Sequence, residues 1–101
     1  MREVAVSVHG VPIRLTAERW QHISQNHPEM GGYYYDILEA IEAPETVRSG
    51  TEGECIAERF SRELQKRIIV VYREYENDGF VITAFTTKRT NWLAKRPQIW
   101  P

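Results

Sequence analysis

Hydrophobic and polar residues alternate over the first fifteen positions of the chain. Glu3 to Val8 and Val11 to Leu15 each follow this two-residue period, and His9-Gly10 between them is a typical turn sequence. Side chains that alternate in this way point to opposite faces of a β-strand. The pattern therefore predicts a short β-hairpin at the start of the chain.

A helix is predicted next, from Ala17 to His27. Thr16 is a good N-cap, Glu18 places an acid in the first turn, and Pro28 ends the helix just after its last residue. At about 100° per residue, Trp20 and Ile23 face the core, whereas Arg19, His22 and Asn26 form a polar flank. This flank combines acid-base and anion-binding groups that could line a cleft.

A second helix follows the flexible Met30-Gly31-Gly32 sequence. Its apolar residues recur at i, i+3, i+4 and i+7, the spacing of a helix with one buried face, at Tyr34, Ile37, Leu38 and Ile41. Pro44 closes this helix.

From residue 45 the pattern changes to β-strands separated by turn sequences. The four predicted strands are Glu45 to Arg48, Glu54 to Phe60, Arg67 to Tyr75 and Phe80 to Thr87. Asp78-Gly79 between the last two is a strong hairpin signal. The run Ile68 to Tyr72 is apolar on both faces, which predicts a central strand. In the strand before it, the pattern leaves open whether Glu58 or Arg59 points to the open side of the sheet.

Helices near the front and strands behind them predict a single α+β domain over residues 1–101. We expect the short hairpin and two helices to pack on one face of a four-stranded antiparallel β-meander, with the other face open. A chain of 101 residues has room for one small core and no second domain.

The composition limits the cellular location that we expect for this protein. Cys55 is the only cysteine, so no disulfide forms within the chain, and no apolar run approaches the roughly 20 residues of a membrane-spanning helix. The first residues form a strand pattern with no export segment. A cytoplasmic protein without membrane contact is therefore expected.

The net charge of −1 argues against nonspecific nucleic-acid binding, but the charge is unevenly distributed. Residues 1–58 carry a net charge of −6 and residues 59–101 a net charge of +5. The last fourteen residues combine four cations with Trp92 and Trp100 and contain no acid. Cations among aromatics suit a phosphate backbone with bases stacked on side chains. The alternative is that the tryptophans fix the tail to the fold and the cations are only solvated.

Metal and thiol chemistry are two alternatives for the site. His22 and His27 are five positions apart, about 140° around a helix, whereas chelation from one helix needs a spacing of four. We therefore predict no metal and no cofactor. Cys55 paired with a histidine would make a small-molecule hydrolase, but a single cysteine in a strand is more often a small core residue.

Metal-free cleavage of RNA fits the residues better. RNA carries its own nucleophile, the 2′-hydroxyl, so the enzyme needs a base, an acid and cations that hold the phosphorane charge. Histidine can take either proton-transfer role, and arginine matches phosphate oxygens. The candidates are His22, Arg19, Arg59 and Lys88, with hydroxyl groups from the last strand at Thr83, Thr86 and Thr87.

Several short motifs, in their order along the chain, resemble a nuclease family. They are the helix Arg-Trp-x-His-Ile-x-x-x-His-Pro-Glu, the sequence Ala-Pro-Glu-Thr-Val after the second helix, and three strand segments, Glu-Arg-Phe, Ile-Ile-Val-Val-Tyr and Val-Ile-Thr-Ala-Phe. The order resembles the phage-associated barnase/EndoU/colicin/RelE-like nuclease domains over residues 12 to 100.

The resemblance implies an α+β fold with a four-stranded meander, a metal-independent ribonuclease site on the sheet, and a role in toxin or phage-conflict systems. The positions that it carries over are Arg19, His22, His27, Arg59 and Thr83. A Glu-Arg-His triad of the barnase type is not assigned from the sequence.

The leading hypothesis is thus an endoribonuclease of the cytoplasm. His22 acts as base or acid with His27 as its counterpart, Arg19 and Arg59 bind phosphate, and the tail from Lys88, with Arg89 and Trp92, holds the RNA strand. A toxin of this kind needs an inhibitor, and an acidic antitoxin-like protein would meet the basic second half of the chain. The competing hypothesis is a non-catalytic module that docks protein or nucleic acid. The sequence leaves the oligomeric state undetermined.

Overall fold

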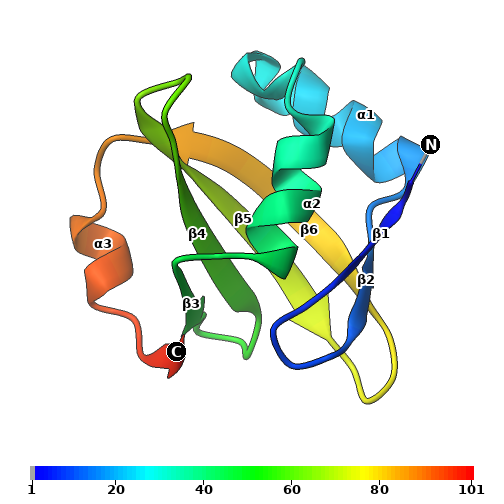
Figure 1. The fold of residues 1–101 in the computed structure, drawn as a ribbon, viewed down its shortest axis with the longest axis vertical. Helices are drawn as coiled ribbons and strands as arrows, with labels where there is room; N and C mark the ends of the chain where they lie inside the picture. Colours follow the sequence, from blue (N-terminus) through cyan, green and yellow to red (C-terminus); the bar gives the residue numbers. More distant parts are fainter. Residues whose placement is uncertain (1) are drawn as a thin grey trace.

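The strands of this chain form one curved sheet that wraps around helix α2 (Figure 1). The structure, a computed structural model, describes residues 2–101. The helices in this range are α1 (Ala17–Asn26), α2 (Tyr34–Glu42) and α3 (Asn91–Ala94), with a 3-10 turn, η1 (Pro28–Met30), directly after α1. The strands are β1 (Val4–Val6), β2 (Pro12–Arg14), β3 (Thr46–Ser49), β4 (Cys55–Ser61), β5 (Lys66–Glu74), β6 (Gly79–Thr87) and β7 (Gln98–Trp100).

The sheet has the order β1-β2-β6-β5-β4-β3-β7. Strands β3 to β6 follow one another as an antiparallel meander, and β5 is the middle strand of the sheet, as its apolar residues predicted. The N-terminal hairpin joins this meander through a short parallel contact, in which Ile13 and Arg14 of β2 pair with Gly79 and Phe80 of β6. Helix α1 packs along β6 beyond this contact.

The predicted turn between β5 and β6 has a clear backbone requirement. The Tyr75 N–H donates to the Asp78 carbonyl at 2.7 Å, which closes the turn. At Gly79 a Cβ atom would lie 2.2 Å from the Arg73 carbonyl oxygen, so only glycine fits this close approach of the two strands.

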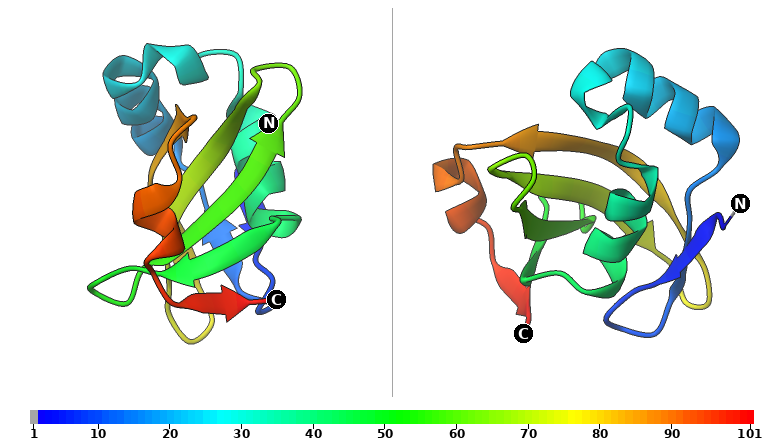
Figure 2. Two further views of the ribbon diagram at one scale, coloured as in Figure 1. Left: turned by 90° about the vertical axis from the view of Figure 1, so that its left-hand side faces the viewer. Right: turned by 45° about the horizontal axis from the view of Figure 1, so that its top comes forward.

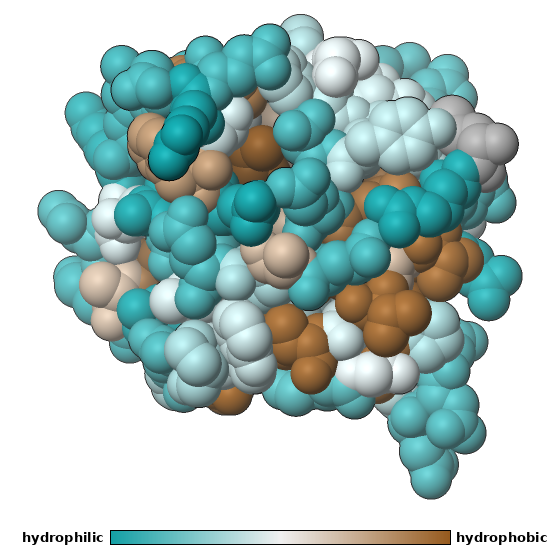
Figure 3. Space-filling model, viewed as in Figure 1, coloured by the Kyte–Doolittle hydropathy of each residue, from teal (hydrophilic) through white to brown (hydrophobic). Residues whose placement is uncertain are grey.

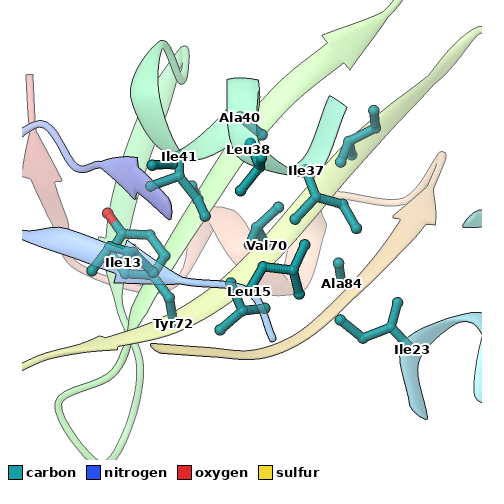
Figure 4. Close-up of a cluster of buried hydrophobic side chains, with 14 of the residues drawn as sticks. Ile13, Leu15, Ile23, Ile37, Leu38, Ala40, Ile41, Val70, Tyr72 and Ala84 are labelled. Atoms are coloured by element: carbon teal, nitrogen blue, oxygen red, sulfur yellow. The ribbon is translucent and has the colours of Figure 1, made fainter. Parts of the chain in front are cut away.

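The hydrophobic core lies between α2 and the concave side of the sheet. Ile37, Leu38 and Ile41 of α2 are fully buried, as their helical spacing predicted, and they point toward Val70 and Tyr72 of β5 (Figure 4). Burying these side chains removes a large apolar area from water and is the main force that holds α2 against the concave side of the sheet.

Helix α1 closes one end of this core. Its N-terminus is capped by Thr16, whose Oγ1 accepts from the Arg19 N–H at 3.1 Å. Ile23 is buried in the core, and the Trp20 ring packs edge-on against Tyr34 with ring centroids 5.3 Å apart. The helix ends at Asn26, one residue earlier than predicted, and His27 is its C-cap. The predicted N-cap and core-facing residues of α1 are confirmed.

A second, smaller cluster lies on the far face, by which we mean the side of the sheet opposite α2. Leu93 of α3 is buried there against Ile56 and Ile69. Figure 2 shows, in its left view, α3 and α2 on opposite sides of the strands. The far face is therefore partly covered by α3 rather than fully open.

The α+β class is confirmed, but the predicted element count is wrong. Residues 2–101 contain three α-helices and a seven-stranded mixed sheet, where the sequence predicted two helices and a four-stranded meander with a separate hairpin. Helix α3 and strand β7, four and three residues long, were not predicted. The hairpin joins the sheet because β2 pairs with β6.

The surface over α2 is mainly hydrophilic (Figure 3). Apolar atoms reach the surface in the right half of this view, toward the region of β1 and β2, and Val4 and Val6 of β1 are exposed. None of the helices within residues 2–101 has the length and apolar character needed to cross a membrane.

Candidate functional site

Three cross-strand rows of side chains make up the centre of the far face. The first row runs from Thr46 through Glu58 and Ile69 to Phe85, across β3, β4, β5 and β6. The other two rows, one on each side of it, are Arg48, Ile56, Val71 and Thr83, and Phe60, Arg67 and Thr87. Arg48 and Arg67 therefore lie diagonally on either side of Glu58.

Glu58 is a carboxylate in the middle of the sheet, and its exposed fraction is only 8%. Thr46 Oγ1 donates to Glu58 Oε1 at 2.5 Å, and Arg67 Nε lies 3.4 Å from Glu58 Oε2. A buried carboxylate needs such partners because its desolvation is costly. The two contacts fix the orientation of Glu58 at the floor of the far face.

Arg67 is held by a second carboxylate at the rim of the sheet. Its Nη1 donates to Glu45 Oε1 at 2.7 Å, and the other oxygen of Glu45 accepts from the Phe60 N–H at 2.8 Å. The hydrogen bond from Arg67, followed by that from Phe60, lowers the pKa of Glu45. The Arg67 guanidinium is thereby fixed beside Glu58.

Arg48 lies diagonally from Glu58 without an ion pair to it, and one of its three side-chain nitrogens has no hydrogen-bond partner. Its Nη1 donates to the Arg96 carbonyl at 2.9 Å and its Nη2 to Gln98 Oε1 at 3.3 Å. Its Nε is buried and has no hydrogen-bond partner; within residues 2–101 only Tyr72 Oη shares this property. A buried donor without a partner is costly, and an anion bound beside it would remove that cost.

Arg48, Glu58 and Arg67 line one pocket of about 160 Å³ on the far face. Leu93 and Ala94 of α3 and Thr90, the residue before this helix, complete its lining. The arrangement places one carboxylate beside the Arg67 guanidinium, and Arg48 and an apolar wall line the same pocket. A carboxylate can accept a proton, and the two cations can hold a phosphate, so the pocket carries a base and the cations for metal-free phosphodiester cleavage, and water is left to act as the acid.

Phe85 ends the first row, and two further aromatic rings, His27 and Trp92, lie beside it. The centroid of the Phe85 ring is 5.7 Å from that of His27, at the end of α1, and 6.1 Å from that of Trp92 in α3. The interplanar angles are 34° and 31°. Of the predicted site residues, His27, Thr83 and Trp92 are thus at the far face.

Arg59 is not at this face. It forms a row with Ile68 and Thr86 on the side of the sheet that carries α2. There its Nη2 lies 2.8 Å from Glu39 Oε1, and its Nη1 donates to the Ala43 carbonyl at 2.5 Å. The structure therefore places Arg59 and Thr83 on opposite sides of the sheet, because neighbouring strand positions face opposite sides and Glu58 occupies the far one.

Arg19 and His22 are both exposed on α1. Arg19 lines a pocket of about 230 Å³ together with Arg14 of β2 and Phe80 at the start of β6. This pocket shares no residue with the Glu58 pocket. Helix α1 therefore does not bring its guanidinium to Arg59, which lines a different pocket beneath α2.

The remaining predicted substrate-binding residues lie around the end of β6. Thr86 is on the α2 side, whereas Thr87 is on the far face, where its Oγ1 accepts from the Arg89 N–H at 3.0 Å. Lys88 and Arg89 are exposed in the turn before α3. Trp92 Nε1 donates to the Arg89 carbonyl at 3.0 Å, which ties this turn to the indole.

The sequence reasoning missed the two arginines of the pocket, Arg48 and Arg67, and left Glu58 undecided. A signal was available only for Glu58, which interrupts a largely apolar strand. Arg48 lies in the short strand Thr-Val-Arg-Ser, and Arg67 follows Lys66 at the start of β5. Thr46, Arg48 and Arg67 point to the same side as Glu58 only because of the strand register, which the sequence does not supply.

Thiol chemistry is not supported at Cys55. The side chain is buried, and burial, followed by the charge of nearby Glu74, raises the pKa of its thiol to about 12. Across residues 2–101, no three His, Cys, Asp or Glu side chains are grouped so that they could hold a metal ion.

We compared the chain with protein-family models, with curated proteins and with solved structures. No family model matches it, and no match is found among the curated proteins or the solved structures.

Proposed function

We propose that this chain is a metal-independent endoribonuclease whose site is the far-face pocket of Arg48, Glu58 and Arg67. The observation that carries the proposal is the position of Glu58, a nearly buried carboxylate held by Thr46 and Arg67 in a pocket that Arg48 also lines. Arg48 adds a second guanidinium group that lines the same pocket.

The reaction follows from these groups. Glu58 removes the proton from the 2′-hydroxyl of RNA, and the resulting oxygen attacks the adjacent phosphorus. Arg48 and Arg67 stabilise the charge that develops on the phosphorane oxygens. The bond to the 5′ oxygen breaks, and this oxygen takes a proton from water. The products are a 2′,3′-cyclic phosphate and a 5′-hydroxyl.

This assignment replaces Arg19, His22 and Arg59 of the sequence-based hypothesis by residues that face one pocket. It keeps the activity that the resemblance to phage-associated nuclease domains implies. A toxin-like enzyme acting on cytoplasmic RNA would require an acidic inhibitor protein, and the cations around the pocket would be its binding surface.

The test is cleavage of a fluorescent single-stranded RNA by the purified chain in the presence of EDTA. We expect cleavage of RNA, no cleavage of the same strand with 2′-O-methyl groups, and a 2′,3′-cyclic phosphate on the product. Glu58→Gln should reduce the rate at least a hundredfold, the range expected for loss of a general base. Glu39→Gln, which removes the partner of Arg59 on the other side of the sheet, is the matched control.

Equal cleavage by wild type and Glu58→Gln would overturn the assignment of the site. RNA that is bound but left intact by the wild type would instead identify the non-catalytic binding module. In that case the chain should also express to high level without arresting growth, because it would not degrade the RNA of its host.

A further inference from the structure

We propose that the ring stack of His27, Phe85 and Trp92 binds an unpaired nucleobase next to the Glu58 pocket, so that the substrate is single-stranded RNA. This inference rests on the proposed function and specifies the substrate of the same site. It assigns a binding role to Phe85, which the sequence did not single out.

The position of the stack follows from the strand register. Phe85 lies in the same cross-strand row as Glu58, with Ile69 between them. Two strand spacings separate Phe85 from Glu58, a distance of about 10 Å. Leu93 of α3 covers Ile69, so a strand whose phosphate occupies the Glu58 pocket must pass over this residue to bring a neighbouring base to Phe85 and Trp92.

The rings are both accessible and fixed. The exposed fraction of Trp92 is 41%, and His27 and Phe85 are partly exposed. The indole is held by its hydrogen bond to the Arg89 carbonyl, and the Arg89 N–H is in turn held by Thr87 Oγ1. A ring that is already fixed loses little conformational entropy when a base stacks on it.

The cations of the segment after β6 favour an anion as the partner, although the Glu29 carboxylate lies 3.8 Å from His27 Nδ1. From Lys88 to the end of the sequence the chain carries four cations and no acid, and Arg48 and Arg67 lie along the same face. An apolar protein surface would gain nothing from these cations. A single strand satisfies both features, because its phosphates meet the cations and its bases stack on the rings.

The pairing state of the RNA follows from the same geometry. Bases inside a duplex are stacked on one another, and their faces are not available to protein side chains. The stack should therefore favour a single strand over a hairpin stem of the same sequence.

The test measures binding of a 2′-O-methyl oligonucleotide, which the enzyme cannot cleave. Anisotropy gives the Kd for wild type, Trp92→Leu, Phe85→Leu and Trp92→Phe. Trp92→Leu and Phe85→Leu should each raise the Kd about tenfold, the loss expected for one stacked base. Trp92→Phe keeps a ring and should restore most of the affinity. Tyr35→Leu, at an exposed aromatic residue of α2, is the control and should bind like wild type.

Salt dependence separates stacking from loss of structure or charge. The slope of log Kd against log salt should be unchanged in Trp92→Leu, because no phosphate contact is removed, and shallower in Arg67→Ala. Circular dichroism and thermal unfolding of each variant verify that it folds.

The outcomes also separate the two proposals. Cleavage by the wild type with equal Kd for Trp92→Leu, Phe85→Leu and wild type, or with equal affinity for single strand and stem, would overturn the stacking site alone. Weaker binding by Trp92→Leu in a chain that never cleaves RNA would support the stacking site and overturn the nuclease.

Discussion

Glu45 accepts a 2.7 Å hydrogen bond from Nη1 of Arg67, whose Nε lies 3.4 Å from the buried Glu58. One guanidinium therefore joins a carboxylate at the rim of the sheet to a carboxylate at its centre. The rim contact sets the orientation of Arg67, and the central contact places its charge at the pocket.

The Glu45 contact predicts a pH dependence of stability. The pKa of Glu45 is lowered in the folded protein from its usual 4.5, so its contribution to folding is present above that pH and is lost as the pH falls through the lower folded value. Replacing Glu45 by Gln should make the free energy of unfolding less sensitive to pH in this acid range. Urea titrations at a series of pH values measure this.

The control for that experiment is Glu76→Gln, at an exposed carboxylate in the turn between β5 and β6. It should follow the pH dependence of the wild type. If Glu45→Gln and wild type show the same dependence of the free energy of unfolding on pH in the acid range, the contact contributes nothing to folding.

Arg67 and Arg59 lie on opposite faces of the sheet, so we expect their replacement to affect the cleavage rate differently. Arg67→Ala should slow RNA cleavage about a hundredfold, because it removes a donor to the charge that develops in the transition state. Arg59→Ala should leave the cleavage rate unchanged, since this side chain pairs with Glu39 on the α2 side. Single-turnover rates with the fluorescent RNA compare the two. The reverse order of effects would restore the sequence-based assignment.

The packing of α2 predicts a large loss of stability in one core variant. Leu38 is fully buried, and Leu38→Ala should lower the free energy of unfolding by about 3 kcal/mol, through lost burial and the cavity left behind. Tyr35→Ala, on the exposed side of the same helix, should change it much less. Chemical denaturation measures both. Similar losses of stability in the two variants would contradict the packing of this face of α2 against the concave side of the sheet.

The environment of Cys55 predicts an unreactive thiol. Because burial and Glu74 raise its pKa to about 12, the thiolate is scarce near neutral pH, and a disulfide reagent should modify the native protein far more slowly than the urea-unfolded protein. Stability should also fall as the pH rises above 9.0, where the unfolded thiol ionises and the folded one does not.

Cys55→Ala isolates this effect and should unfold with a weaker dependence on alkaline pH. Rapid modification of the native wild type at pH 7 would contradict the burial of the thiol.

Much of the secondary structure was predictable because its signals are local. Thr16 caps a helix and Pro28 ends it, the spacing of Ile37, Leu38 and Ile41 marks a buried helical face, and Asp78-Gly79 marks a hairpin. Helix α3 and strand β7 were missed because they owe their form to packing on the far face and on β3.

The candidate site was predicted only in part. His27, Thr83 and Trp92 do lie at the far face, but Arg59 does not, and Arg48 and Arg67 were not considered. Alternation along a strand separates two sets of residues without saying which set faces the helices. For β4 that choice decided between Glu58 and Arg59.

The sequence by itself determined the order and type of the main elements, because caps, breakers and hydrophobic periods act within a few residues of one another. Only the tertiary structure decided that Arg48, Glu58 and Arg67 share a pocket. These residues come from three strands, and their meeting depends on register and on the side of the sheet that α2 covers, both of which are set by packing between distant parts of the chain.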